Sequence, residues 1–196
     1  MEFESLRPAV LLPLLAAGFA AQRASQTVLD AFYARSGYPV PYYEGQLSFS
    51  ADRLRGWYSA MEANGTLGVY WQTQFVDFAF IAATMLFFVM LLAAVARAFP
   101  PDSGGRRFAG RIIWLGLAGP LFDVVENLLS FLMLPDPGSI SPIVAMLYSS
   151  AAALKFAAFT AVYLWTVIGL SAAVMLRLRA RTNTTELSAS AEAQCR

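Results

Sequence analysis

The stretch from Phe78 to Ala96, FAFIAATMLFFVMLLAAVA, decides the class of fold, because it contains no charged residue. A helix needs about 20 predominantly apolar residues to cross the hydrocarbon core of a bilayer, and this stretch meets that requirement. Two further stretches, Arg111 to Leu134 and Ile143 to Leu176, are also long and apolar enough. The sequence therefore predicts transmembrane helices over residues 70–97, 109–134 and 143–177.

The composition of the whole chain supports a membrane protein. The 196 residues are 58% hydrophobic and only 14% charged, whereas soluble domains carry about 25% charged residues. The net charge of +1 and the lack of a dense basic cluster argue against nucleic-acid binding. The chain has no histidine and one cysteine, Cys195. This excludes histidine-based zinc sites, Ser-His-Asp triads and an intrachain disulfide. We predict no metal site, and the sequence leaves the identity of any cofactor unknown.

A fourth helix is expected near the N-terminus, over residues 8–33. Its uncharged run from Pro8 to Gln22 is short for a membrane span, and a cleaved signal peptide is the alternative. The leader MEFESLR lacks the positive charge typical of signal peptides, and the helical pattern continues beyond Gln22. We therefore expect an all-α, four-helix transmembrane bundle that forms one domain over residues 1–180. The polar tail over residues 181–196 is expected to be disordered and cytoplasmic.

The distribution of arginine predicts the orientation, because cytoplasmic loops are enriched in Lys and Arg. With both termini in the cytoplasm, the cytoplasmic side receives Arg7, Arg97, Arg106, Arg107, Arg111, Arg177, Arg179, Arg181 and Arg196. This multi-pass orientation puts the loop over residues 35–69 outside. The short loop between the last two spans, PDPGSIS, carries no arginine.

The long outer loop is expected to be partly helical. Its prolines predict an extended stretch from Gly37 to Tyr43. Ser50 then caps a short helix that carries Leu54, Trp57, Tyr58 and Met61 on one side. Asn64 and Gly65 end this helix. Asn64-Gly65-Thr66 also matches a glycosylation acceptor, which is the alternative interpretation.

Ionisable residues within the predicted spans are the candidates for function, because charge inside a membrane is costly. These residues are Asp77, Asp123, Glu126 and Lys155. We expect Asp123, Glu126 and Lys155 to be the candidate catalytic residues. Helical spacing places further polar residues on the same faces, so we predict a ligand-binding set of Asp77, Tyr70, Gln74, Asn127 and Tyr148. The stripes from three helices should face one another in a pocket that opens outward, away from lipid.

The charges of this predicted pocket do not balance. Three acids face one lysine, and an uncompensated excess of two negative charges is not stable in a medium of low dielectric constant. Either an acid is protonated, or a cation binds, or Arg53 or Arg55 reaches in from the outer loop. A purely structural network of ion pairs is the alternative.

One pattern resembles a known group of proteins. Gly65-x-x-Gly68-x-Tyr70 precedes Asp77, Asp123-x-x-Glu126-Asn127 follows, and Lys155 lies in the last helix. This arrangement is similar to that of a large family of uncharacterised small four-helix membrane proteins, over residues 29–176. The resemblance implies the fold and supplies no reaction. A hydroxyl residue expected shortly before the lysine is replaced here by Ala151, Ala152 and Ala153.

Four functions remain open from the sequence. The first is a pocket that binds a small amphipathic or cationic molecule such as a lipid headgroup, with Trp57, Tyr58, Tyr70 and Trp71 covering the cation. The second is a membrane enzyme, isomerase- or cyclase-like, in which Asp123 or Glu126 acts as general acid or base on a lipophilic substrate. The others are a proton- or ion-coupled carrier and a structural subunit. Membrane lipid is the expected partner.

Overall fold

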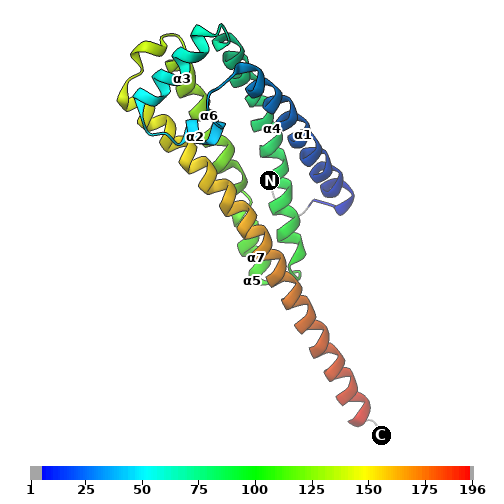
Figure 1. Ribbon diagram of the computed structural model, residues 1–196. Helices are drawn as coiled ribbons and strands as arrows, with labels where there is room; N and C mark the ends of the chain where they lie inside the picture. The colour runs from blue at the N-terminus through cyan, green and yellow to red at the C-terminus, as the bar shows by residue number, and fades with distance from the viewer. Residues whose placement is uncertain (1–5, 195–196) are drawn as a thin grey trace.

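The computed structural model describes residues 6–194, with side chains up to Arg179. Within that range every regular element is helical (Figure 1). In chain order the elements are α1 (Pro8–Ser36), α2 (Tyr42–Gln46), α3 (Ala51–Ala63), α4 (Leu67–Ala98), α5 (Gly104–Ile112), α6 (Leu115–Met133), the 3₁₀ turn η2 (Pro137–Ser139) and α7 (Pro142–Gln194).

Three helical segments are long and apolar enough to cross a membrane. They are Leu67–Ala98, Gly104–Met133 and Pro142–Arg179, and they correspond to the three apolar stretches of the sequence. This finding indicates a helical membrane protein. The first helix, α1, is not among the three, and its second half carries polar and charged residues such as Arg23 and Asp30.

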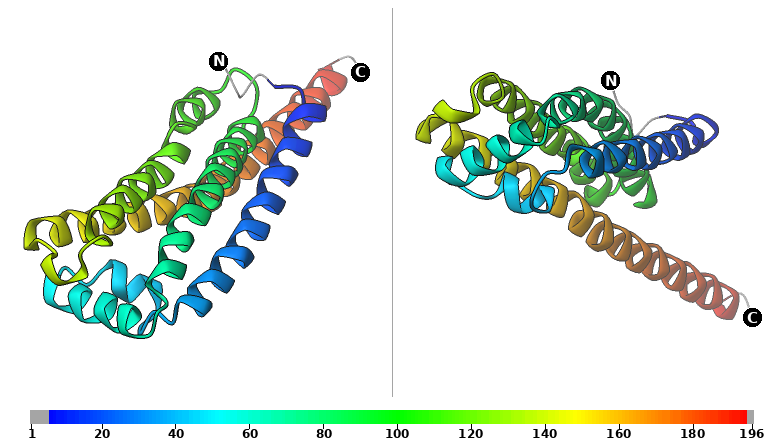
Figure 2. Two further views of the ribbon diagram at one scale, coloured as in Figure 1. Left: turned by 90° about the horizontal axis from the view of Figure 1, so that it is seen from above. Right: turned by 45° about the horizontal axis from the view of Figure 1, so that its top comes forward.

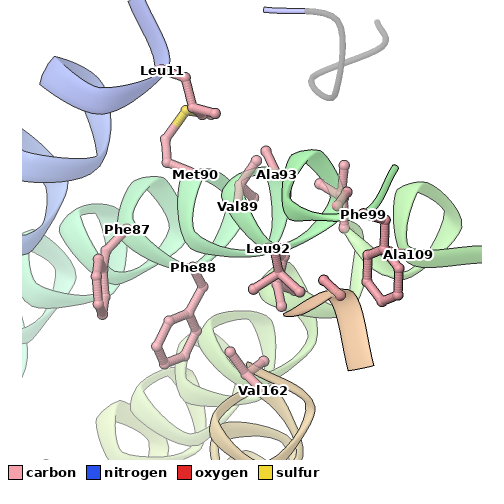
Figure 3. Packing of buried hydrophobic residues seen from close by; sticks show 14 residues of the cluster. Leu11, Phe87, Phe88, Val89, Met90, Leu92, Ala93, Phe99, Ala109 and Val162 are labelled. Carbon is pink, nitrogen blue, oxygen red and sulfur yellow. The ribbon is translucent and has the colours of Figure 1, made fainter. Parts of the chain in front are cut away.

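The helices are arranged around α4. Along its length α4 contacts α1 on one side and α6 and α7 on the other (Figures 1 and 2). Gly18 is a point of close approach between α1 and α4, since a Cβ atom there would lie 3.0 Å from the backbone of Phe87. A buried apolar cluster with Leu11, Phe88, Leu92 and Val162 joins α1, α4 and α7 (Figure 3).

The loop between α1 and α4 forms a cap over one end of the bundle. As predicted, Ser50 caps α3 and its side chain accepts a hydrogen bond from the Arg53 amide. Also as predicted, α3 ends before Asn64, and Gly65 adopts a positive φ of 69°. The apolar side of α3 packs into a second buried cluster that includes Leu54, Tyr58, Met61, Tyr70, Met133 and Tyr148.

The structure differs from the sequence expectations in the segment of α2 and around α5 and α6. Tyr42 and Tyr43 begin the short helix α2 and are not extended. The helix expected over 109–134 begins earlier, at Gly104, where Ser103 accepts a hydrogen bond from the Arg106 amide. It is also divided in two at Ile113, whose carbonyl accepts from the Gly116 amide in a tighter, 3₁₀-like turn.

The last helix does not end near residue 177. It continues to Gln194, through the segment expected as a tail. Between Ser171 and Gln194 the sequence has neither glycine nor proline, the two residues that most often end a helix.

Candidate functional site

Lys155 of α7 lies at the centre of the site. Its Nζ lies 3.0 Å from Asp123 Oδ1 and 2.5 Å from Glu126 Oε2, both on α6. It also donates a hydrogen bond of 3.3 Å to Gln46 Oε1 of α2. All four residues are buried, and only 4% of Lys155 is exposed. Two carboxylates therefore share one ammonium group inside the bundle.

Asp77 of α4 is the third buried acid. Its Oδ2 accepts a hydrogen bond of 2.7 Å from Asn127 Nδ2 of α6, and both side chains are buried. The amide of Asn127 is neutral, so this contact satisfies one carboxylate oxygen without balancing its charge. When ionised, Asp77 adds a third negative charge to a site that holds one ammonium group.

A cavity of about 190 Å³ lies against this cluster, between α1, α2, α4, α6 and α7. Asp77, Asp123 and Lys155 reach its wall, whereas Glu126 does not. Glu126 is 1% exposed and packs behind Lys155. It is consequently placed to hold the lysine, while Asp77 and Asp123 are placed to meet a bound molecule.

The other predicted site residues are buried but do not line the cavity. Tyr148 is next to the Glu126 carboxylate, with which it interacts electrostatically. Tyr70 lies in the first turn of α4 beneath the cap, and its ring stacks on that of Tyr38 with centroids 5.1 Å apart. Gln74 is 2% exposed and lies on α4, one turn before Asp77. The helix faces were therefore assigned correctly to the interior, but only part of each face reaches the cavity.

Two arrangements that the sequence left open around the site do not occur in the structure. Arg55 does not reach the acids, because it pairs with Asp52 at 2.8 Å and donates to the Ile140 carbonyl at 2.6 Å. Arg53 is exposed on α3. The rings expected to cover a cation, Trp57, Tyr58, Tyr70 and Trp71, pack within or against the cap cluster and do not line the cavity.

Residues that sequence analysis missed supply much of the wall. Gln46 and Tyr42 come from α2, which lies in a segment expected to be a loop. Four others, Gln22, Gln26, Leu29 and Tyr33, lie on one face of α1 and line the cavity. Their spacing of four, three and four residues marks one helix face and was a usable signal. For Gln46 no local pattern exists.

The cap contains tyrosines with perturbed ionisation. Burial raises the pKa of Tyr58 above its ordinary value, and burial raises that of Tyr38 further. Burial, together with the nearby charge of Asp30, raises the pKa of Tyr42. These hydroxyls therefore stay neutral at physiological pH and add no charge around the acids.

Among the residues that the structure describes, no group of three or more metal-binding side chains is arranged to hold a metal ion. The chemistry available is that of carboxylates, one ammonium group, amides and aromatic rings. No family model, no curated protein and no solved structure matches the chain significantly.

Proposed function

We propose that this protein is an integral membrane protein with four spans and both termini in the cytoplasm, whose cavity binds a small amphipathic molecule with a cationic group. In this proposal α1 is the retained first span, supported by its packing along α4. The cap, together with η2, then lies on the outer side. The arginine-rich ends of α4, α5 and α7 lie in the cytoplasm, in accord with the enrichment of Lys and Arg in the cytoplasmic loops of membrane proteins.

One observation carries the proposal: three buried carboxylates face a single buried ammonium group beside an open cavity. An isolated ionised carboxylate in an apolar medium is strongly unfavourable. With Arg53 and Arg55 placed elsewhere, a proton or a bound cation must supply the missing positive charge. A cation at the wall formed by Asp77 and Asp123 would balance the cluster.

The proposed family relationship draws support from the same cluster. Asp77, Asp123, Glu126, Asn127 and Lys155 belong to the pattern, and the structure gives them two sets of contacts: Asn127 with Asp77, and Lys155 with Asp123 and Glu126. Gly68 and Tyr70 lie in the first turn of α4, and Gly65 lies just before it.

An enzymatic role is the second candidate, and one observation favours it. Asp123 reaches the cavity, and its Oδ1 pairs with Lys155 Nζ. A carboxylate paired with a lysine therefore faces any bound molecule and can act as acid or base. Glu126 is removed from the cavity and would position Lys155. An isomerase- or cyclase-like reaction would therefore depend on Asp123 or Asp77 as acid or base.

The binding proposal is tested by thermal unfolding of the purified protein in neutral detergent with dodecylammonium or dodecanol. Dodecylammonium should raise the unfolding temperature, and uncharged dodecanol of the same chain length should not. Asp77→Asn should weaken the amine effect by about tenfold or more, equivalent to about 1.4 kcal/mol. Asp52→Asn, on the exposed side of α3, is the matched control. Equal effects of amine and alcohol would contradict the proposal.

A further inference from the structure

The cavity walls differ in polarity from one end to the other. Along α4 its lining runs from Asp77 through Phe80 and Thr84 to Phe88. At 1.5 Å per residue this distance is about 16 Å. Along α7 the lining runs in the same direction, from Lys155 to Phe159 and Tyr163. A charged end and an aromatic end thus lie along one elongated space.

The partly exposed residues of the lining lie mainly on α1 and α7, so the space is most open between these two helices. Both helices pack against α4, and the right-hand view of Figure 2 shows them separating with distance from the cap. Among the lining residues Tyr163 is 49% exposed and Tyr42 is 39% exposed. Gln22 and Gln26 on the α1 side are partly exposed, as are Phe156 and Phe159 on the α7 side. The cap covers the end of the bundle, so the cavity opens sideways.

The two edges of the mouth have opposite character. The α1 edge offers amides, and Gln26 donates a hydrogen bond of 2.7 Å to Asp30. The α7 edge offers the rings of Phe156, Phe159 and Tyr163. A polar headgroup can therefore move along α1 while it forms hydrogen bonds to the glutamine amides. The apolar chain can at the same time remain in contact with the rings of α7.

From this geometry we infer that the ligand is a single-chain cationic amphiphile that enters from the membrane through the opening between α1 and α7. The cationic head rests on Asp77 and Asp123, and the chain passes Phe159 and Tyr163 toward the lipid. This inference rests on the proposed function. It proposes a lateral opening in place of the expected outward one and specifies the class of molecule.

The test uses the full chain in nanodiscs and a 12-carbon alkylamine with a terminal diazirine. After photolysis, peptide mapping should find labelling on α1 and α7 near Gln22 and Tyr163, and dodecylammonium should compete with it. The short cation ethylammonium should compete poorly. Gln26→Trp should slow labelling several-fold, whereas Val28→Trp, on the exposed side of the same helix, should not.

Competed labelling on α3 or η2, or equal rates in the two tryptophan variants, would overturn lateral entry and leave amine binding intact. Loss of all competed labelling, together with no thermal stabilisation by dodecylammonium, would overturn both. If Gln26→Trp fails to fold, Gln22→Trp on the same edge replaces it, with the same expectation.

Discussion

Asn127 donates a 2.7 Å hydrogen bond to Asp77, and this bond joins the middle of α6 to α4. A neutral donor thereby orients a buried carboxylate without supplying a positive charge. Lys155 pairs with two further acids, Asp123 and Glu126. The acids of the site thus outnumber its single ammonium group, and this imbalance is the basis of the proposed cation binding.

The first prediction concerns the lysine. Lys155→Met should destabilise the protein by about 3–5 kcal/mol, because three buried carboxylates lose their only cationic partner in the site. Adding Asp123→Asn and Glu126→Gln should recover much of this loss. Thermal or denaturant unfolding in detergent measures both effects. Arg53→Met, an exposed charge on α3, is the control, and equal stability of the two single variants would contradict the assignment.

The second prediction concerns the contact of α1 with α4. Gly18→Ala should destabilise by about 1–3 kcal/mol, because the added methyl group meets the Phe87 backbone at 3.0 Å. Gly56→Ala in α3 adds the same group where no atom lies within 4 Å, and should stabilise by up to about 1 kcal/mol. The difference is measured by unfolding in the same detergent. No difference between the variants would show that α1 does not pack tightly on α4.

The third prediction concerns alkaline pH. Because burial raises the pKa of Tyr58 in the folded state, stability is full below the unfolded pKa of about 10. It should fall as the pH rises above that value, since the unfolded chain releases the proton first. Tyr58→Phe should lose less stability over this range, as followed by the unfolding temperature. Tyr43→Phe, an exposed ring, should behave as wild type.

The fourth prediction tests the proposed orientation. Cys195 is the single cysteine of the chain, so a membrane-impermeant maleimide reports on one site. It should not react in intact cells and should react after permeabilisation. With Cys195→Ser in place, Ser139→Cys in the exposed turn η2 should react in intact cells. The reverse pattern would invert the orientation without affecting the fold.

Much of the fold was predictable because it depends on local composition. The apolar stretch from Phe78 to Ala96 has to lie in a helix where water is absent, since only there are all its backbone groups satisfied. Ser50 and Asn64-Gly65 marked the ends of α3 through short-range hydrogen bonds and a left-handed residue. The length of α7 was not predictable in this way, because its polar end carries no strong stop signal.

The candidate site was predictable only in its charged members. Burying Asp77, Asp123, Glu126 or Lys155 is so costly that their presence in apolar helices implied a meeting point. The periodicity also assigned Asn127 to the face of Asp123. Neither argument could tell which of these side chains reach open space. Glu126 and Tyr148 are as buried as Asp123 and lie outside the cavity.

The sequence by itself determined most of the helices, the N-cap residue of α3 and the set of charged residues that must face away from lipid. Only the tertiary structure decided that Gln46 reaches Lys155 across 109 positions of the chain, that Arg55 turns to Ile140, and that one face of α1 lines the cavity. The physical reason is that sequence patterns report interactions over a short range along the chain. Helical periodicity fixes the direction of a side chain relative to its own axis, whereas the partner it meets depends on how separate helices pack.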